Sequence, residues 1–152
     1  MTVALVMVKF VIIASVYNAT IIHSFQTDLQ SVQYQVDVYT ADVKHAGTDA
    51  NVFITIYGSN GDTGRRPLTK KFTDLFERGK RDEFKLEALD LGSLLRLRIE
   101  HDNKGLGAGW MLDKIVITNT ASQEVTTFPC NQWLDKKQGD SKISRDLFPL
   151  QK

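Results

Sequence analysis

Apolar and polar side chains alternate with a period of two along most of the chain after residue 33. The clearest alternating runs are residues 33–40, 51–57, 83–88 and 94–101. This period is typical of β-strands that turn one face to a core and the other to water, as strands of antiparallel sheets commonly do. In the last run, Leu95, Leu97 and Ile99 are expected to point inward.

Clusters of turn-forming residues separate these runs. They are residues 45–49, 58–67, 77–80, 90–93, 102–109 and 136–141. The chain offers at least six strands between such turns and no convincing amphipathic helix, so the pattern predicts an antiparallel β-sandwich. Its two inner faces are expected to meet in a core about 10 Å thick.

Three glycines stand at alternate positions, Gly105, Gly107 and Gly109, and raise the question of a phosphate-binding loop. Such a loop needs a helix directly after it, because the helix N-terminus supplies the amide donors that hold the phosphate. Here the β-branched run 115–118 follows, which favours a strand. We therefore interpret the glycines as a bend between packed strands.

Composition limits the classes of function. The 152 residues suffice for one domain, and 42% hydrophobic with 24% charged residues is an ordinary globular mixture. A net charge of +1 gives no global field for nucleic acid, so no nucleic-acid partner is expected. The single cysteine, Cys130, cannot form an internal disulfide.

Motifs of known enzyme classes are not evident in the sequence. There is no nucleophile elbow, paired-histidine metal motif or phosphate-loop lysine pattern, and His23, His45 and His101 are scattered. We therefore expect no enzymatic activity and no small-molecule substrate.

The N-terminal residues 3–17 are almost wholly apolar. The run is shorter than the roughly 20 residues of a membrane span, but its length suits a secretory signal. We therefore treat residues 1–24 as a candidate signal peptide, 25–32 as a spacer and 33–150 as the folded domain. An extra hydrophobic strand or a segment without function is the alternative. A cleaved signal would make the protein extracellular; otherwise we expect it at the cytoplasmic face of a membrane.

Five segments, in order and spacing, resemble the PLAT domain, also called the lipoxygenase-homology or LH2 domain. They are residues 34–58 with "AGTDA", 74–84 with "FERG", 97–117, 128–134 with "FPCNQWL", and 144–149. The resemblance implies an all-β sandwich of two four-stranded antiparallel sheets. It also implies a non-catalytic module that binds membrane lipids or protein partners, often with calcium.

The resemblance places candidate calcium ligands in two loops. By it, the carboxylates of Asp49, Asp74 and Glu77 match positions that bind calcium in the family, with the backbone carbonyls of Gly47 and Thr48 nearby. Calcium takes six to eight oxygens, and three carboxylates can supply up to about six of them. The resemblance thus implies one weak calcium site.

The sequence departs from the family's calcium-binding pattern at one position for this site and at one position for a second ion. Leu75 stands where calcium-binding relatives often carry a carboxylate, and His45 stands where some carry an acid for a second ion. Asp62, in a neighbouring turn, is an outside candidate. The alternative is that Asp49 caps a turn through its side chain and that Glu77 pairs with a neighbouring basic residue, Arg78 or Lys80.

The resemblance also points to membrane contacts. Trp133 matches a tryptophan that inserts into membranes in relatives, whereas Leu106 and Lys44 stand where strong binders have tryptophan. Arg65 and Arg66 are basic candidates for contact with anionic lipid. The alternative for Trp133 is packing in the core beside Phe128, and the alternative for the arginines is a solvated charged face.

A second functional class stays open, a calcium-independent module that binds a protein partner through an exposed sheet face. The outward positions of the first two predicted strands carry side chains suited to an interface: Tyr39, Phe53, Thr55 and Tyr57.

Overall fold

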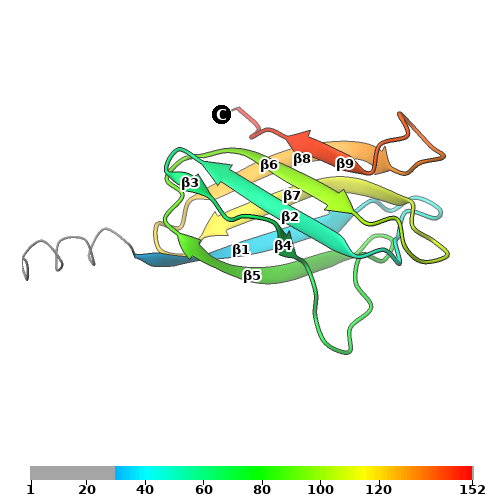
Figure 1. Cartoon of the computed structure of the whole chain (residues 1–152), viewed down its shortest axis with the longest axis horizontal. Helices are drawn as coiled ribbons and strands as arrows, with labels where there is room; N and C mark the ends of the chain where they lie inside the picture. The colour runs from blue at the N-terminus through cyan, green and yellow to red at the C-terminus, as the bar shows by residue number, and fades with distance from the viewer. Residues whose placement is uncertain (1–29, 152) are drawn as a thin grey trace, which may run out of the picture. The chain divides into compact units, whose positions relative to one another are not determined.

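The alternating runs form strands in two antiparallel sheets (Figure 1). The protein is described by a computed structural model, which covers residues 30–151. The strands are β1 (Ser31–Thr40), β2 (Val52–Gly58), β3 (Gly61–Asp62), β4 (Arg66–Pro67), β5 (Arg81–Leu89), β6 (Leu94–His101), β7 (Trp110–Asn119), β8 (Val125–Leu134) and β9 (Ser144–Leu147). The first sheet has the order β5-β1-β7-β8 and the second the order β3-β2-β6-β9, with β4 also paired to β2.

The predicted sandwich is confirmed, and its second sheet has an interrupted edge strand. β3 and β4 contribute two residues each and both pair with β2, Asp62 lying opposite Tyr57 and Pro67 opposite Phe53. They therefore act as one broken strand along one edge. Counted separately, β3 and β4 give the second sheet five strands; taken as one edge strand, they complete the four that the resemblance implied.

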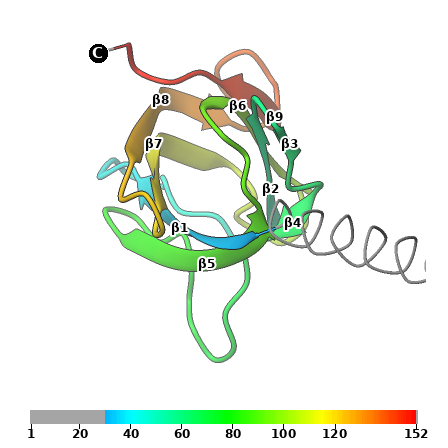
Figure 2. The ribbon, with the colours of Figure 1, turned by 90° about the vertical axis from the view of Figure 1, so that its left-hand side faces the viewer.

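The core lies between the two sheets, whose strands surround it when the molecule is viewed along the strands (Figure 2). Its largest fully buried side chains include Trp110, Tyr34 and Phe128. The Trp110 indole N–H donates a hydrogen bond to Thr40 Oγ1 at 3.0 Å, so its one polar group is satisfied inside the core. The strand after the three glycines is β7, which agrees with their interpretation as a bend.

The prediction that Leu95 points inward was wrong. Leu97 and Ile99 are fully buried, but Leu95 is 56% exposed. On β6, Arg96 lies opposite Tyr57 and Leu94 lies opposite Gly58, so Leu95 has no partner on β2. Such an extra residue is a β-bulge, and it reverses the inside–outside alternation of the residues before it.

The predictions for residues 1–24, and for most of the spacer 25–32, fall outside the described residues and stay predictions. The described part of the chain contains no helix with the length and hydropathy that a membrane span requires.

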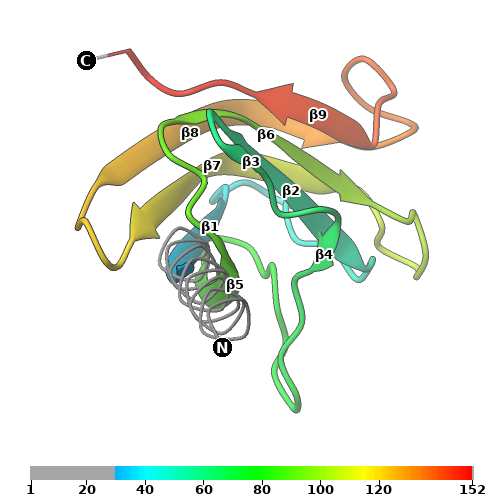
Figure 3. The same cartoon turned by 60° about the vertical axis from the view of Figure 1, so that its left-hand side comes forward.

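The long connection between β4 and β5, loop 68–80, projects away from both sheets (Figure 3). Its base is fixed by Phe76, whose ring centroid lies 5.2 Å from that of Trp110 and 5.8 Å from that of Phe84. The Phe76 N–H donates to Oδ2 of the buried Asp82 at 2.7 Å. Phe72, four residues earlier, has a relative exposure of 105%.

These two phenylalanines make a matched pair for a stability measurement. Phe76→Ala should lower the free energy of unfolding by about 3–5 kcal/mol, because it removes a buried ring and leaves a cavity. Phe72→Ala, in the same loop, should change it by no more than about 0.5 kcal/mol, because its ring contacts mainly water. Denaturant unfolding of both variants tests this, and equal losses would contradict the anchoring role of Phe76.

Candidate functional site: the loops at one end of the sandwich

The connections after β1, β6 and β8 gather at one end of the sandwich, on the right in Figure 1. We call them loop 41–51, loop 102–109 and loop 135–143. The base of loop 68–80 returns to the same end, where β5 begins. The end therefore brings together loops that are far apart in sequence, as the resemblance implied.

Backbone hydrogen bonds join three of these loops. From loop 41–51, the Thr48 N–H donates to the Phe76 carbonyl at 3.3 Å, and the Asp49 N–H donates to the Gly107 carbonyl at 3.0 Å. In return, the Gly107 N–H donates to Asp49 Oδ2 at 3.1 Å. Loop 41–51 is thus the central element to which the other two are tied.

The glycine at position 105 is required by this packing. Its φ is +91°, and a Cβ there would lie 2.8 Å from the Cβ of Asp49, closer than real side chains approach. Loop 102–109 therefore lies directly against Asp49.

The predicted calcium ligands share a cavity wall without forming a metal-binding group. Thr48, Asp49, Asp74 and Glu77 line a cavity of about 290 Å³, whereas Gly47 lines another cavity. Within residues 30–151, no three or more His, Cys, Asp or Glu side chains are grouped so that they could hold a metal ion.

Two further features of these residues work against a calcium site. One Asp49 oxygen accepts from Gly107, and the carbonyls of Phe76 and Gly107 accept from loop 41–51. Leu75 packs against the core, so it is a structural residue at the position where a ligand would help. As arranged, these residues do not fit calcium, which needs six or more convergent oxygens.

The structure also bears on the alternative roles considered for the acidic residues, turn capping and ion pairing. Asp49 does accept a backbone hydrogen bond through its side chain, but from another loop and not from its own turn. Among the described residues Glu77 forms no ion pair with Arg78 or Lys80, and Arg78 pairs instead with Asp42 at 2.7 Å. Asp62 accepts the Gly64 N–H at 2.7 Å within its own turn.

The predicted membrane residues are spread over the surface. Leu106 is fully exposed at the tip of loop 102–109, and Lys44 is exposed on loop 41–51. Arg65 stacks 3.4 Å above the ring centroid of Phe53 and pairs with Glu100, so its charge is already shared within the second sheet. The Arg66 side chain donates to the carbonyl of Thr63.

Trp133 is half-buried and lies outside the core cluster that contains Phe128. It lines a cavity of about 430 Å³ together with Leu106 and Asp135, between loops 102–109 and 135–143. The expected packing beside Phe128 is therefore not found, and Trp133 belongs to the loop end.

Phe72 was missed as a candidate. It is the one aromatic residue in the polar stretch 69–74, directly after Lys70 and Lys71. Its φ of +56° is uncommon for a bulky residue. An aromatic residue that directly follows two lysines in a polar stretch was the signal by which the sequence could have indicated Phe72.

The outward aromatic residues of the sheets are covered by cations. Arg96 lies 3.9 Å from the ring centroid of Tyr57, and Lys114 lies 4.9 Å from that of Tyr39. With Arg65 over Phe53, these contacts give the outer sheet faces a mixed aromatic and cationic surface.

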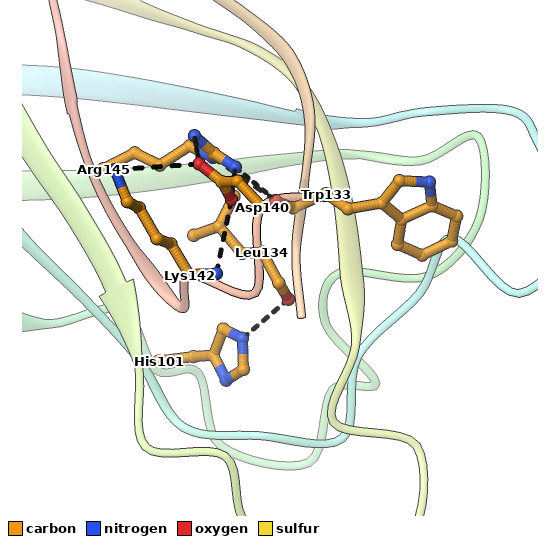
Figure 4. Close-up of polar contacts among 6 residues, drawn as sticks. All are labelled: His101, Trp133, Leu134, Asp140, Lys142 and Arg145. Carbon is orange, nitrogen blue, oxygen red and sulfur yellow. Dashed lines mark hydrogen bonds and ion pairs between the residues drawn. The ribbon is translucent and has the colours of Figure 1, made fainter. Parts of the chain in front are cut away.

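Loop 135–143 is held by Arg145, as Figure 4 shows. The Arg145 guanidinium donates to the Trp133 carbonyl at 2.9 Å and binds the Asp140 carboxylate, whose pKa it holds below the ordinary range. The Trp133 indole points to the opposite side of the strand.

Buried His101 ties the end of β6 to the end of β8. Its Nδ1 accepts the Asn103 N–H at 3.1 Å, so its other nitrogen, Nε2, carries the hydrogen and donates to the Leu134 carbonyl at 2.9 Å (Figure 4). The two contacts hold the ring in one orientation. His101 is therefore a structural residue at the root of loop 102–109.

The family model of the PLAT/LH2 domain matches residues 34–148, and the chain belongs to this family. Over 129 residues it is 52% identical to human Lipoxygenase homology domain-containing protein 1, with 83% of this chain and 6% of that protein aligned. Over 120 residues it is 36% identical to human Polycystin-1-like protein 3, with 78% of this chain and 7% of that protein aligned. The chain thus spans a small part of these relatives.

Solved structures of lipoxygenases contain a similar domain. The structure of a coral 8R-lipoxygenase, described as activated by calcium through a C2-like domain, matches with a TM-score of 0.68 and 30% identity. That match covers 77% of this chain and 17% of the lipoxygenase. A calcium-dependent 11R-lipoxygenase matches with a TM-score of 0.59 and 28% identity, covering 78% of this chain and 17% of the enzyme.

Asp102 supplies a pH-dependent contact at the root of loop 102–109. The Asn51 side-chain amide donates to its Oδ2 at 2.6 Å, and this bond is the main reason that the pKa of Asp102 falls to about 2. Because the folded pKa lies below the unfolded value of about 3.9, the contact should stabilise the fold above about pH 4 and be lost as the pH falls towards 2. Carboxyl NMR titration should give a pKa near 2.

The matched variant for this titration is Asp102→Asn, which cannot ionise. Its unfolding free energy should fall less than that of the wild type between about pH 4 and pH 2. A measured Asp102 pKa near 4, or equal acid sensitivity of the two proteins, would contradict the assignment.

Proposed function

We propose that this domain is a non-catalytic targeting module that attaches to membrane surfaces through two apolar loop tips. The observation that carries the proposal is the full exposure of Phe72 on loop 68–80 and Leu106 on loop 102–109, at 105% and 107%. Transfer of each side chain from water to an apolar phase is worth about 1.5–3 kcal/mol. Neither tip is held against the body by its own side chain, so both are available for insertion.

Basic side chains beside these tips support the same function. Lys70 and Lys71 precede Phe72, and Lys104 precedes Leu106 by two residues. A lysine close to an anionic bilayer contributes about 1 kcal/mol, and ionic strength screens this contribution. The combination of an apolar tip and flanking lysines therefore suits the interface of an anionic membrane.

One solved structure supports a regulatory, non-catalytic role for a domain of this fold. The coral 8R-lipoxygenase structure is described in terms of calcium activation through a C2-like domain. A domain that attaches in this way is associated with a membrane. Whether residues 1–24 are cleaved as a signal determines on which side of the membrane it lies. The resemblance implies calcium assistance, but the candidate ligands do not form a metal-binding group within residues 30–151, so the attachment that we propose needs no calcium.

A protein partner is the second candidate function, and the outer face of the second sheet favours it. Phe53 and Tyr57 are presented there beneath Arg65 and Arg96, at 3.4 and 3.9 Å from the ring centroids. Aromatic and arginine side chains are the types enriched in protein interfaces. This face lies along β2 and β6 and does not include either loop tip.

Vesicle sedimentation tests the membrane proposal. Phe72→Ala and Leu106→Ala should each weaken binding to phosphatidylcholine–phosphatidylserine vesicles by about tenfold or more, because each removes an inserted apolar side chain. The matched control is Leu95→Ala, an exposed leucine at the far end of β6 from loop 102–109, which should bind as the wild type does. Unchanged binding of both loop variants would contradict the proposal.

A further inference from the structure

We infer that Asp49 acts as a hydrogen-bonded clamp between the loops, so that this domain holds its membrane-binding arrangement without calcium. The inference rests on the proposed function and concerns how that function is regulated. Asp49 is, by the family resemblance, a calcium ligand. The geometry assigns it instead to loop 102–109.

The clamp consists of reciprocal hydrogen bonds between two residues 58 positions apart. The backbone N–H of Asp49 donates to the carbonyl of Gly107 at 3.0 Å, and the N–H of Gly107 donates to Asp49 Oδ2 at 3.1 Å. A bond from a backbone N–H to a carboxylate is stronger than one between neutral groups. The two bonds together fix both the distance and the orientation of loop 102–109.

Thr48 extends the clamp on the same side. Its hydroxyl donates to the Ala108 carbonyl at 2.9 Å and accepts the Ala50 N–H at 3.1 Å. Its own N–H donates to the Phe76 carbonyl at 3.3 Å, which joins the base of loop 68–80. The carbonyls of Phe76, Gly107 and Ala108 are therefore engaged in hydrogen bonds to loop 41–51.

The backbone contour of loop 102–109 fits the clamp closely. A Cβ at Gly107 would lie 3.1 Å from Asp49 Oδ2, a tight contact, and one at Gly105 would collide with the Asp49 Cβ. The carboxylate therefore lies against bare backbone. A metal ion that pulled the Asp49 carboxylate away from loop 102–109 would have to break the bond to Gly107.

The consequence for function concerns Leu106, which lies between the two glycines that contact Asp49. Asp49 thereby acts as a positioning residue for one of the two membrane-inserting tips. A calcium-bridged end would bind membranes only when calcium is present. A clamped end would bind at all calcium concentrations.

Three variants separate a clamp from a calcium ligand. Asp49→Asn keeps a side-chain oxygen that can accept the Gly107 N–H but loses the negative charge that calcium requires. Asp49→Ala loses both. Asp74→Asn removes a candidate calcium ligand that takes no part in the clamp.

The full chain and these variants are tested with phosphatidylcholine–phosphatidylserine vesicles, in millimolar calcium and in EGTA. Wild type, Asp49→Asn and Asp74→Asn should bind alike in both buffers, whereas Asp49→Ala should bind about tenfold more weakly in both. Amide hydrogen exchange at Gly107 in EGTA should be slow in wild type and Asp49→Asn and fast in Asp49→Ala.

Calcium-dependent binding of the wild type, lost in Asp49→Asn and Asp74→Asn, would overturn the inference. Failure of the wild type to bind in either buffer would contradict the proposed function instead. Gly107 exchange and the thermal unfolding midpoint would then decide on the clamp. A midpoint that calcium raises in wild type but not in Asp49→Asn overturns it, and an unchanged midpoint with protected Gly107 supports it.

Discussion

The burial of Phe76 between Trp110 and Phe84 is the contact on which the arrangement of the loop end depends. Phe76 belongs to a connection and not to a strand, yet it is 3% exposed and packs with core residues of β5 and β7. Its backbone takes a left-handed conformation, with a φ of +58°, which Asp82 supports by accepting its N–H. Its carbonyl then accepts from Thr48, so the core fixes the place where the loops meet.

Beyond Phe76, hydrogen bonds hold the other loops of this end in place. Thr48 and Asp49 connect loop 68–80 to loop 102–109, and His101 connects the root of loop 102–109 to the end of β8. Phe72 and Leu106 are the most exposed of the large apolar side chains in the described part of the chain. A rigid base with exposed apolar tips is suited to attachment at an interface, because insertion then requires little ordering of the protein.

Much of this fold could be predicted from the sequence, because each main strand has one wet face. Alternation indicated β1, β2, β5 and β6, and the β-branched run after the glycines indicated β7. Leu95 could not be placed correctly, since its bulge is set by the register of β6 against β2 and not by local sequence. The family motifs predicted which loops meet, but not which oxygens are engaged.

The two phenylalanines of loop 68–80 show why the candidate site could not be predicted fully from the sequence. Phe72 and Phe76 are four residues apart, share a left-handed backbone and differ completely in burial. Only tertiary packing decides which of them enters the core. Likewise, the sequence around Asp49 is the same whether its side chain binds calcium or accepts a hydrogen bond from Gly107. Only the three-dimensional structure shows the hydrogen bond.

The most direct measurement of the central claim places a fluorescent reporter at the tip of loop 68–80. The fluorescence of the added tryptophan in Phe72→Trp is obtained by subtracting the wild-type spectrum. In anionic vesicles this fluorescence should shift to the blue and be quenched by brominated lipids, in EGTA as well as in calcium. Emission that stays unshifted and unquenched in vesicles, or that changes only when calcium is added, would contradict metal-independent insertion.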